Sequence, residues 1–400
     1  MYDKPITIPP PLMTSEPGSY ARRTVVERMP QIIDQVIADN EYAPRIVAAL
    51  EELKVEIRSK AIQALTEPAA DVAQWNRELT AHRGKTWLDV PWYFAETYFH
   101  RRLLEAVEYF QPGPYRAHDP FGKQKQQQED AAVKGLKERW GQLSDADPER
   151  GFDALLHASL WGNRADLSRF TATSLADGPL MTGKEDRYIL IDHTDQVREL
   201  LSQGVQRVDF ISDNVGFDLL FDLVLADFLL ARGWVHGVVF HVKGHPFFVS
   251  DAMVRDVQET VSLLCGESNP ATQELGARLW GYLEAGHLVL KEDTFWTSSL
   301  LFRRLPPRLR TTLSNSELVI LKGDVNYRRL LDDAHWPHTT RMEEAAAYFP
   351  ASFVTLRTLK GEIIVGLQPG QAEALYAEDP TWLINGKRGI IQFDKHPKYT

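Results

Sequence analysis

Cysteine and long charge blocks are nearly absent from this chain of 400 residues. The single cysteine, Cys265, can form no intrachain disulfide and belongs to no CxxC pair, so a disulfide framework is excluded. A reducing, cytoplasmic setting is therefore expected. The net charge is −10, and no run of five or six like charges occurs. Because nucleic-acid binders normally carry a basic footprint, nucleic acid is not an expected partner.

A long apolar run is also missing. The first residues, MYDKPITIPPPLM, contain no apolar core of a secretory signal. The most apolar stretch, from Leu219 to Leu230, is interrupted by Asp222 and Asp227, so it is not expected to span a membrane. We expect a soluble protein with no membrane partner. No heptad run indicates an oligomeric state, which the sequence leaves unknown.

Several common catalytic motifs are absent. GKT at 84–86 is not a P-loop, because Leu79 stands where the upstream glycine belongs. There is no GxGxxG after a strand, no GxSxG and no HExxH. His335 and His338 form an HxxH, but neither they nor His245 have a second ligand pair at zinc spacing, so all three are interpreted as surface or core histidines. Walker-type nucleotide hydrolysis, Rossmann dehydrogenase chemistry and serine hydrolysis are therefore not expected.

The first half of the chain shows helical periodicity. Helices are predicted over 24–40, 43–65, 92–110, 130–143 and from 151 to about Gly162. The polar stretch FGKQKQQQED at 121–130 is interpreted as a solvated loop that leads into the fourth helix. Glu96, Arg101 and Asn163 are polar residues inside these apolar motifs, and they are expected either to face the active site or to form ion pairs within the helical part.

The second half changes to short β-rich runs that alternate with helical patterns. Strands are predicted over 188–192, 207–212, 237–242, 287–291, 317–322, 352–357 and 389–393. Helices are predicted between them over 217–233 and 252–264. This alternation is typical of an α/β fold with a largely parallel, Rossmann-like sheet and crossover helices. The linker DGPLMTGKED places the boundary near residue 180, which gives a helical domain at 1–180 and an α/β domain at 181–400.

Polar side chains follow the predicted strands at their carboxyl ends, where open α/β sheets bind ligands. They are Asp213 and Asn214 after 207–212, Lys243, His245 and Asp251 after 237–242, Lys322 to Asn326 after 317–322, and Arg357 to Lys360 after 352–357. Asp213, Asn214 and Asp251 offer the oxygen ligands that Mg²⁺ or Mn²⁺ prefers. An equally simple interpretation of Asp213 is a helix N-cap.

An anionic substrate would suit the same edge of the sheet. Lys322, Arg328 and Lys360 could hold phosphate oxygens, and Asn326 could bond hydroxyl groups. Gly216 precedes the predicted helix 217–233, whose free N–H groups could cradle an anion.

Three of these stretches resemble a known family. SDNVGFDLLFDLVLADFLL, KGDVNYRRL and RTLK are similar to motifs of the metal-dependent damage-control phosphatases, also described as acidic residue methyltransferase-like. The Arg-Thr-x-Lys motif resembles the sugar-phosphate phosphatase branch, subfamily III, as do PWYFAETYFHRRL, LWGNRADLS and DTFWT. The resemblance covers about residues 15 to 370.

The resemblance implies a helical N-terminal domain on a three-layer α/β/α core and a catalytic Mn²⁺, Co²⁺, Ni²⁺ or Mg²⁺ ion. The implied metal ligands and catalytic residues are Asp213, Asn214 and Asp251. The implied substrate contacts are Asp218, Lys322, Gly323, Asp324, Val325, Asn326 and Lys360. Relatives often carry Glu where this chain has Asp218, which is shorter by one methylene.

The resulting hypothesis is a metal-dependent phosphomonoesterase that acts on small sugar phosphates, such as fructose 1-phosphate or fructose 6-phosphate, or on related metabolites. Asp213 is either a metal ligand alone or a nucleophile that forms an aspartyl-phosphate, and Asp218 is a candidate general base. The first alternative is an S-adenosylmethionine-dependent protein carboxyl methyltransferase. The second is a sugar-phosphate sensor without turnover, and a third is recruitment to an unusual phosphorylated intermediate.

Overall fold

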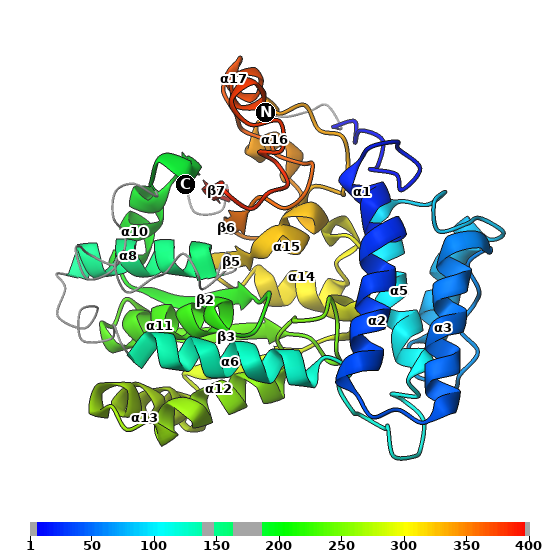
Figure 1. The fold of residues 1–400 in the computed structure, drawn as a ribbon. Coiled ribbons are helices and arrows are strands. Elements are labelled where there is room, and N and C mark those ends of the chain that lie inside the picture. The colour runs from blue at the N-terminus through cyan, green and yellow to red at the C-terminus, as the bar shows by residue number, and fades with distance from the viewer. Residues whose placement is uncertain (1–5, 138–147, 163–185, 397–400) are drawn as a thin grey trace.

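The computed structural model describes residues 6–137, 148–162 and 186–396. Helices near the N-terminus stand beside a sheet that is covered on both faces (Figure 1). The helices are α1 (Tyr20–Arg23), the π-helical η1 (Thr24–Arg28), α2 (Met29–Asp39), α3 (Pro44–Ser59), α4 (Val72–Leu79), η2 (Thr80–His82), α5 (Trp92–Ala106), α6 (Gly122–Lys137), α8 (Pro148–Trp161), η4 (Asp186–Tyr188), α10 (Thr194–Ser202), α11 (Phe217–Ala231), α12 (Val254–Gly266), α13 (Pro270–Ala285), η5 (Thr294–Thr297), η6 (Phe302–Arg304), α14 (Pro307–Leu313), α15 (Gly323–Leu330), α16 (Met342–Ala345) and α17 (Gln371–Glu378).

The sheet has seven strands in the order β1-β7-β6-β5-β2-β3-β4. Their bounds are β1 (Ile189–Asp192), β2 (Val205–Ile211), β3 (Val235–Val242), β4 (Leu288–Glu292), β5 (Leu318–Lys322), β6 (Phe353–Thr358) and β7 (Gly389–Asp394). The run from β6 to β4 is parallel, whereas β7 is antiparallel to β6 and pairs in parallel with β1. All seven predicted strands are confirmed.

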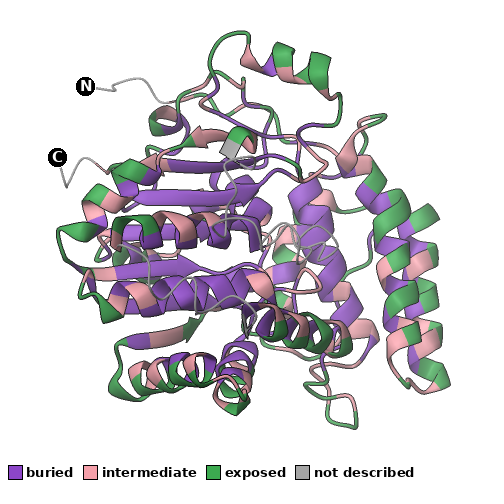
Figure 2. Ribbon diagram, turned by 60° about the vertical axis from the view of Figure 1, so that its left-hand side comes forward, coloured by how far each residue is buried: buried purple, intermediate pink, exposed green. Residues whose placement is uncertain are grey.

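The central strands are buried because both faces of the sheet are covered (Figure 2). In β5, Leu318 and Ile320 belong to one apolar core, together with residues of α8, α11, α12 and α13. Val319 and Leu321 belong to the other core, together with residues of α14 and α15. Successive side chains of a strand point to opposite faces, so the sheet separates two helical layers. The predicted three-layer α/β/α architecture is confirmed.

A third apolar core lies among the N-terminal helices and runs from Val25 to Phe121 along the chain. Its helices α2, α3 and α5 match predicted ones, and α3 begins at Pro44, where a first helical turn tolerates proline. The domain boundary near residue 180 lies outside the described residues and stays a prediction.

The expectation of a loop at 121–130 is wrong, since α6 begins at Gly122 and runs through this stretch. Lys125 and Glu129 are both buried. Lys125 Nζ donates to the carbonyl of Asp251 (2.9 Å) and to Oδ2 of Asp256 (2.8 Å). The polar stretch therefore forms one turn after another of a half-exposed helix, whose buried face carries Lys125 with partners on α12 and the preceding loop.

The acids inside the apolar helix α11 are paired. Asp227 Oδ2 lies 2.7 Å from Arg278 Nη2, and Asp222 Oδ1 lies 2.7 Å from Lys322 Nζ. Burial of these carboxylates is thus offset by direct ion pairs. Among the helices of the described ranges, none has both the length and the apolarity needed to cross a bilayer.

Candidate functional site

A cavity of about 530 Å³ lies where the carboxyl ends of β2, β3, β5 and β6 meet the N-terminal helices. Most of the predicted site residues line it. These are Asp213, Asn214, Asp218, Asp251, Asp324, Val325, Arg328 and Lys360. Lys322, Gly323 and Asn326 are not part of its wall. The topological argument that the strand ends converge is therefore confirmed, although individual side chains differ in what they contact.

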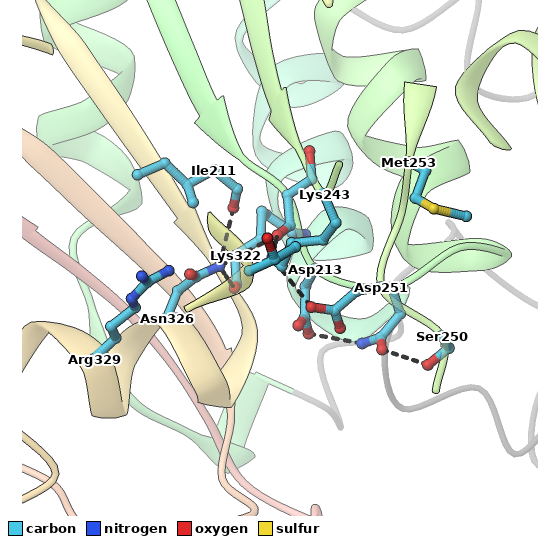
Figure 3. Close-up of polar contacts among 12 residues, drawn as sticks. Ile211, Asp213, Lys243, Ser250, Asp251, Met253, Lys322, Asn326 and Arg329 are labelled. Atoms are coloured by element: carbon cyan, nitrogen blue, oxygen red, sulfur yellow. Dashed lines mark hydrogen bonds and ion pairs between the residues drawn. The ribbon is translucent and has the colours of Figure 1, made fainter. Parts of the chain in front are cut away.

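Asp213 and Asn214 follow β2 and are fixed to the segment that carries Asp251. Asn214 and Asp251 form an isolated antiparallel bridge, and the Ala252 N–H donates to the carbonyl of Asp213 (2.8 Å). Asn214 Nδ2 donates to Asp213 Oδ2 (2.7 Å), while Asn214 Oδ1 accepts from Ser250 Oγ (2.6 Å). Figure 3 shows the carboxylates of Asp213 and Asp251 directed into the same space.

The two carboxylates are costly to keep there as anions. Asp251 is 1 % exposed, and Lys243 Nζ lies 3.1 Å from its Oδ2. Lys243 is therefore the ion-pair partner of this buried carboxylate. Burial raises the pKa of Asp251, and burial together with the charges of Asp218 and Asp251 raises the pKa of Asp213 well above its ordinary value. The site therefore favours binding of further positive charge.

Gly323 is required by the position of Asp213. Its φ is +80°, and a Cβ at this position would lie 1.9 Å from Asp213 Oδ2. No side chain larger than hydrogen fits without moving that carboxylate. Gly323 thus shapes the site by close backbone approach, a contact that the sequence did not indicate.

The ammonium group of Lys322 forms ion pairs with two carboxylates beside the cavity. Its Nζ lies 2.9 Å from Asp218 Oδ1 and 2.7 Å from Asp222 Oδ1, and it donates to Ser159 Oγ (2.7 Å). Burial, opposed by Lys322, raises the pKa of Asp222 to about 7. Lys322 is therefore placed to hold Asp218, which does line the cavity, in a fixed position.

The helix α15 is also held by buried ion pairs. Arg328 donates to Asp333 through Nε (2.7 Å) and to Glu96 through Nη1 (2.6 Å), and its Cζ lies 3.3 Å from the ring centroid of Trp92. Arg328 therefore lines the cavity with a guanidinium that is already paired. Its partner Glu96 lines the same cavity.

Asp324 and Asn326, which are predicted substrate contacts, form hydrogen bonds with other groups of the protein. Asp324 accepts from Arg357 Nε (2.8 Å) and from the Lys360 N–H (3.1 Å). Asn326 Nδ2 donates to the carbonyls of Lys322 (2.8 Å) and Ile211 (3.3 Å), as Figure 3 shows. Asn326 thus joins the ends of β2 and β5.

The segment before Asp251 carries unusual backbone that sequence reasoning missed. Phe248 and Val249 both line the cavity, with φ of +45° and +68°. Bulky and β-branched residues rarely adopt this region, and such strain gathers at functional sites. No glycine marks the turn, so residue types alone do not indicate it.

Other candidates lie away from the cavity. Arg101 is paired with Glu67 and Asp71, both at 2.7 Å, so the ion-pair interpretation of this residue is correct. Asn163 lies outside the described residues. Burial lowers the pKa of His245 to about 4, and His335 Nε2 lies 2.8 Å from Glu16 Oε1.

A separate acidic cluster lies between α6 and α12. Oxygens of Glu129, Asp256 and Glu259 lie within 4.8 Å of one another. Burial, followed by the charges of Asp256 and Glu259, raises the pKa of Glu129 to about 8, and Lys125 opposes this shift.

The fold and the cavity define the class of protein. A parallel sheet with clustered carboxylates, an amide and a lysine at its carboxyl edge is typical of a metal-assisted enzyme. In overall structure the chain is similar to a DUF89 family protein from Pyrococcus horikoshii, with a TM-score of 0.54 and 12 % identity over 94 % of this chain and 98 % of that one. This likeness concerns the fold.

Sequence comparison specifies the family. Residues 24–375 match the model described as the damage-control phosphatase ARMT1-like domain. The chain is 33 % identical to damage-control phosphatase ARMT1 of Danio rerio, over 96 % of this chain and 97 % of that protein. It is 32 % identical to the human protein of that name, over 97 % and 99 %. The chain therefore belongs to the ARMT1-like damage-control phosphatase family, and it is a phosphatase.

Proposed function

We propose that the chain is a metal-dependent phosphomonoesterase that hydrolyses small sugar phosphates or related phosphorylated metabolites, with Asp213, Asn214 and Asp251 as metal ligands. The observation that supports this most directly is the buried pair of Asp213 and Asp251, whose carboxylates are directed into one space and whose pKa values stay raised although Lys243 Nζ lies 3.1 Å from Asp251 Oδ2. Buried carboxylates of this kind are expected to coordinate a metal or to be neutralised.

The donor set fits a hard divalent cation. Two carboxylates and an amide oxygen are the ligand types that Mg²⁺ and Mn²⁺ prefer. Asn214 Nδ2 faces Asp213, so its Oδ1 becomes available to a cation after the amide rotates by half a turn. Ser250 Oγ would then accept from Nδ2, because a hydroxyl group can both donate and accept.

The protein groups would orient the substrate and the attacking oxygen. Lys360 Nζ would bind phosphate oxygens, and the N–H groups at the start of α11 would assist it. Lys322 would hold Asp218 toward the reacting centre. The bound divalent ion would supply Lewis-acid stabilisation of the phosphate oxygens. Overall, water adds to phosphorus, the ester P–O bond breaks and the sugar hydroxyl leaves with one proton.

Asp213 would act either as a ligand alone or as the nucleophile. In the second scheme its carboxylate attacks phosphorus, and water then cleaves the acyl phosphate. Asp213→Ala abolishes turnover in both schemes, whereas a phosphoenzyme trapped from the wild-type protein is expected only in the second.

The carboxyl methyltransferase alternative has less support, because the chain has no glycine-rich cofactor loop after its first strand. Calorimetry with S-adenosylmethionine on metal-stripped protein would revive this alternative if binding were tight. A sensor without turnover would bind sugar phosphates but release no phosphate with any metal.

The function is tested by phosphate release from p-nitrophenyl phosphate, fructose 1-phosphate and fructose 6-phosphate. Metal-stripped protein is assayed alone and with Mn²⁺, Co²⁺, Ni²⁺ or Mg²⁺. We expect release only with metal. The test variant is Asp251→Ala. The matched control is Glu52→Ala, which changes an exposed acid of α3 that is not part of the cavity wall. Equal activity of wild type and Asp251→Ala would contradict the proposed ligand set.

A further inference from the structure

The acids on the cavity wall are largely matched by bases. Four of them form ion pairs at 2.6 to 3.1 Å, which are Glu96–Arg328, Asp218–Lys322, Asp251–Lys243 and Asp324–Arg357. The bases in these pairs are consequently not available as strong anion ligands. A substrate anion beyond the reactive phosphate would need a different cation.

Arg28 provides such a cation. It lines the cavity from the helical N-terminal part and is exposed. No carboxylate of the described residues lies within ion-pair distance of its guanidinium. Arg28 and Lys360 both line this one cavity. A guanidinium without a carboxylate is well suited to bidentate binding of a carboxylate or phosphate.

The backbone around Arg28 is also unusual. Arg28 is the last residue of η1, a π-helical turn between α1 and α2, and the Met29 N–H donates to the carbonyl of Thr24. Such a turn contains one more residue than an α-helical turn, so it changes the face on which the following side chains lie. Isolated π turns are frequent at functional sites.

Arg28 also lines a smaller cavity of about 170 Å³. We call this smaller space the satellite cavity. Arg28, Ile32 and Val249 belong to the walls of both. The satellite cavity also has Gln31 and Gln124 in its wall, and its described lining residues include no acid. The side-chain amides of Gln35 and Gln124 donate to Asp39 Oδ2 (2.8 and 3.0 Å), so an anion there would be bound mainly by the Arg28 guanidinium.

We propose that Arg28 binds a second anionic group of the substrate, a carboxylate or a second phosphate, at the satellite cavity. This rests on the proposed function, in which the reactive phosphate lies near Asp213 and Lys360. The substrate class is then narrowed to small phosphorylated metabolites that carry a further anion. Arg28 acts as a specificity residue and takes no part in breaking the P–O bond.

The test compares substrates that differ by one anionic group. Fructose 1,6-bisphosphate is paired with fructose 1-phosphate, and 3-phosphoglycerate is paired with glycerol 3-phosphate. The variant is Arg28→Gln, and the control is Arg58→Gln, an exposed arginine of α3 that lies outside both cavity walls. Each protein is checked for unchanged thermal unfolding before kcat/KM is measured.

We expect wild type and Arg58→Gln to prefer the doubly anionic member of at least one pair. In Arg28→Gln, kcat/KM for that member should fall by roughly 10- to 100-fold, as expected for the loss of hydrogen bonds to a charged group. The singly anionic member should change by less than about threefold. The pair that responds identifies the second anion as a phosphate or a carboxylate.

Three results would overturn the inference. They are the absence of any wild-type preference, an equal loss for both members of a pair, and a loss in Arg58→Gln as large as in Arg28→Gln. Calorimetry on metal-stripped proteins separates this inference from the proposed function. If Arg28 governs tighter binding of the doubly anionic member while no metal supports turnover, the phosphatase assignment fails and the role of Arg28 stands.

Discussion

Gly323→Ala should damage the site more than it damages the fold. A Cβ at Gly323 would lie 1.9 Å from Asp213 Oδ2, whereas ordinary van der Waals contact begins at 3.4 Å. Asp213 must therefore move by about 1.5 Å, which is the difference between these distances. Because Asn214 and Ala252 hold Asp213 by hydrogen bonds, the displacement disturbs the whole ligand group.

The expected magnitude has two parts. An alanine forced to a φ of +80° costs about 1 to 2 kcal/mol of stability. Gly204→Ala is a matched control, because Gly204 has a φ of +81° and its Cβ would meet nothing within 4 Å. Misplacement of a catalytic group by about 1 Å costs roughly 100-fold in rate. Both variants should thus lose similar stability, and Gly323→Ala alone should lose kcat/KM by roughly 100-fold.

The assay combines urea unfolding with metal-dependent phosphate release for the two variants and wild type. Calorimetric titration with Mn²⁺ adds a readout that is independent of turnover, and Gly323→Ala should bind more weakly. Wild-type activity in Gly323→Ala would refute the steric argument. An equal loss of activity in Gly204→Ala would show that backbone strain is responsible.

Three further predictions concern buried polar groups. Lys322→Met leaves two carboxylates of α11 without their base and should lower the free energy of unfolding by roughly 3 to 5 kcal/mol; an unchanged urea midpoint would contradict this. Ser250→Ala removes the hydrogen bond that orients Asn214 and should raise the Kd for Mn²⁺ by roughly tenfold or more in calorimetry, whereas an unchanged Kd would exclude an orienting role. The pKa of Glu129 in the folded protein is about 8, above its ordinary value of 4.5. Between these two pH values the folded protein binds more protons than the unfolded chain. The free energy of unfolding therefore falls as the pH rises from 4.5 to about 8. Glu129→Gln should therefore match wild type near pH 5 and exceed it by roughly 2 to 4 kcal/mol at pH 9, and a pH-independent difference would refute this.

The strands and their carboxyl-edge residues could be predicted because burial and topology constrain them locally. A run such as LVILK at 318–322 is apolar enough to indicate a strand buried on both faces, and the residues after it must lie at the ligand-binding edge. The placement of Asp213, Asn214 and Asp251 on one cavity follows from this reasoning. Their role as metal ligands stays a prediction.

The partners of the basic residues could not be predicted, because they come from distant parts of the chain. Arg328 was interpreted as a phosphate ligand, yet its guanidinium pairs with Glu96, which is 232 positions away. Lys322 is likewise occupied by acids of α11. The position of a charged residue after a predicted strand shows that it lies at the carboxyl edge of the sheet. It does not show whether an opposite charge from another part of the chain pairs with it there.

The helix α6 and the turn at Phe248 were missed for other reasons. The stretch before Asp130 is rich in Gln and Lys, which are good helix formers, so its polarity did not exclude a helix. Lys125 Nζ binds the carbonyl of Asp251 and the carboxylate of Asp256, which fixes one face of this half-exposed helix. The turn at Phe248 depends on tertiary contacts that override local preference. Phe248 adopts a positive φ without the glycine that normally marks such a turn.

The most direct test of the account is a Mn²⁺ titration of metal-stripped protein that follows phosphate release from fructose 1-phosphate. Wild type should change from no release to saturable release, and Asp251→Asn should remain inactive or require far more metal, because it loses one charged ligand. Release from stripped wild-type protein before metal is added, or an identical titration curve for Asp251→Asn, would contradict the central claim that these buried carboxylates hold a catalytic metal.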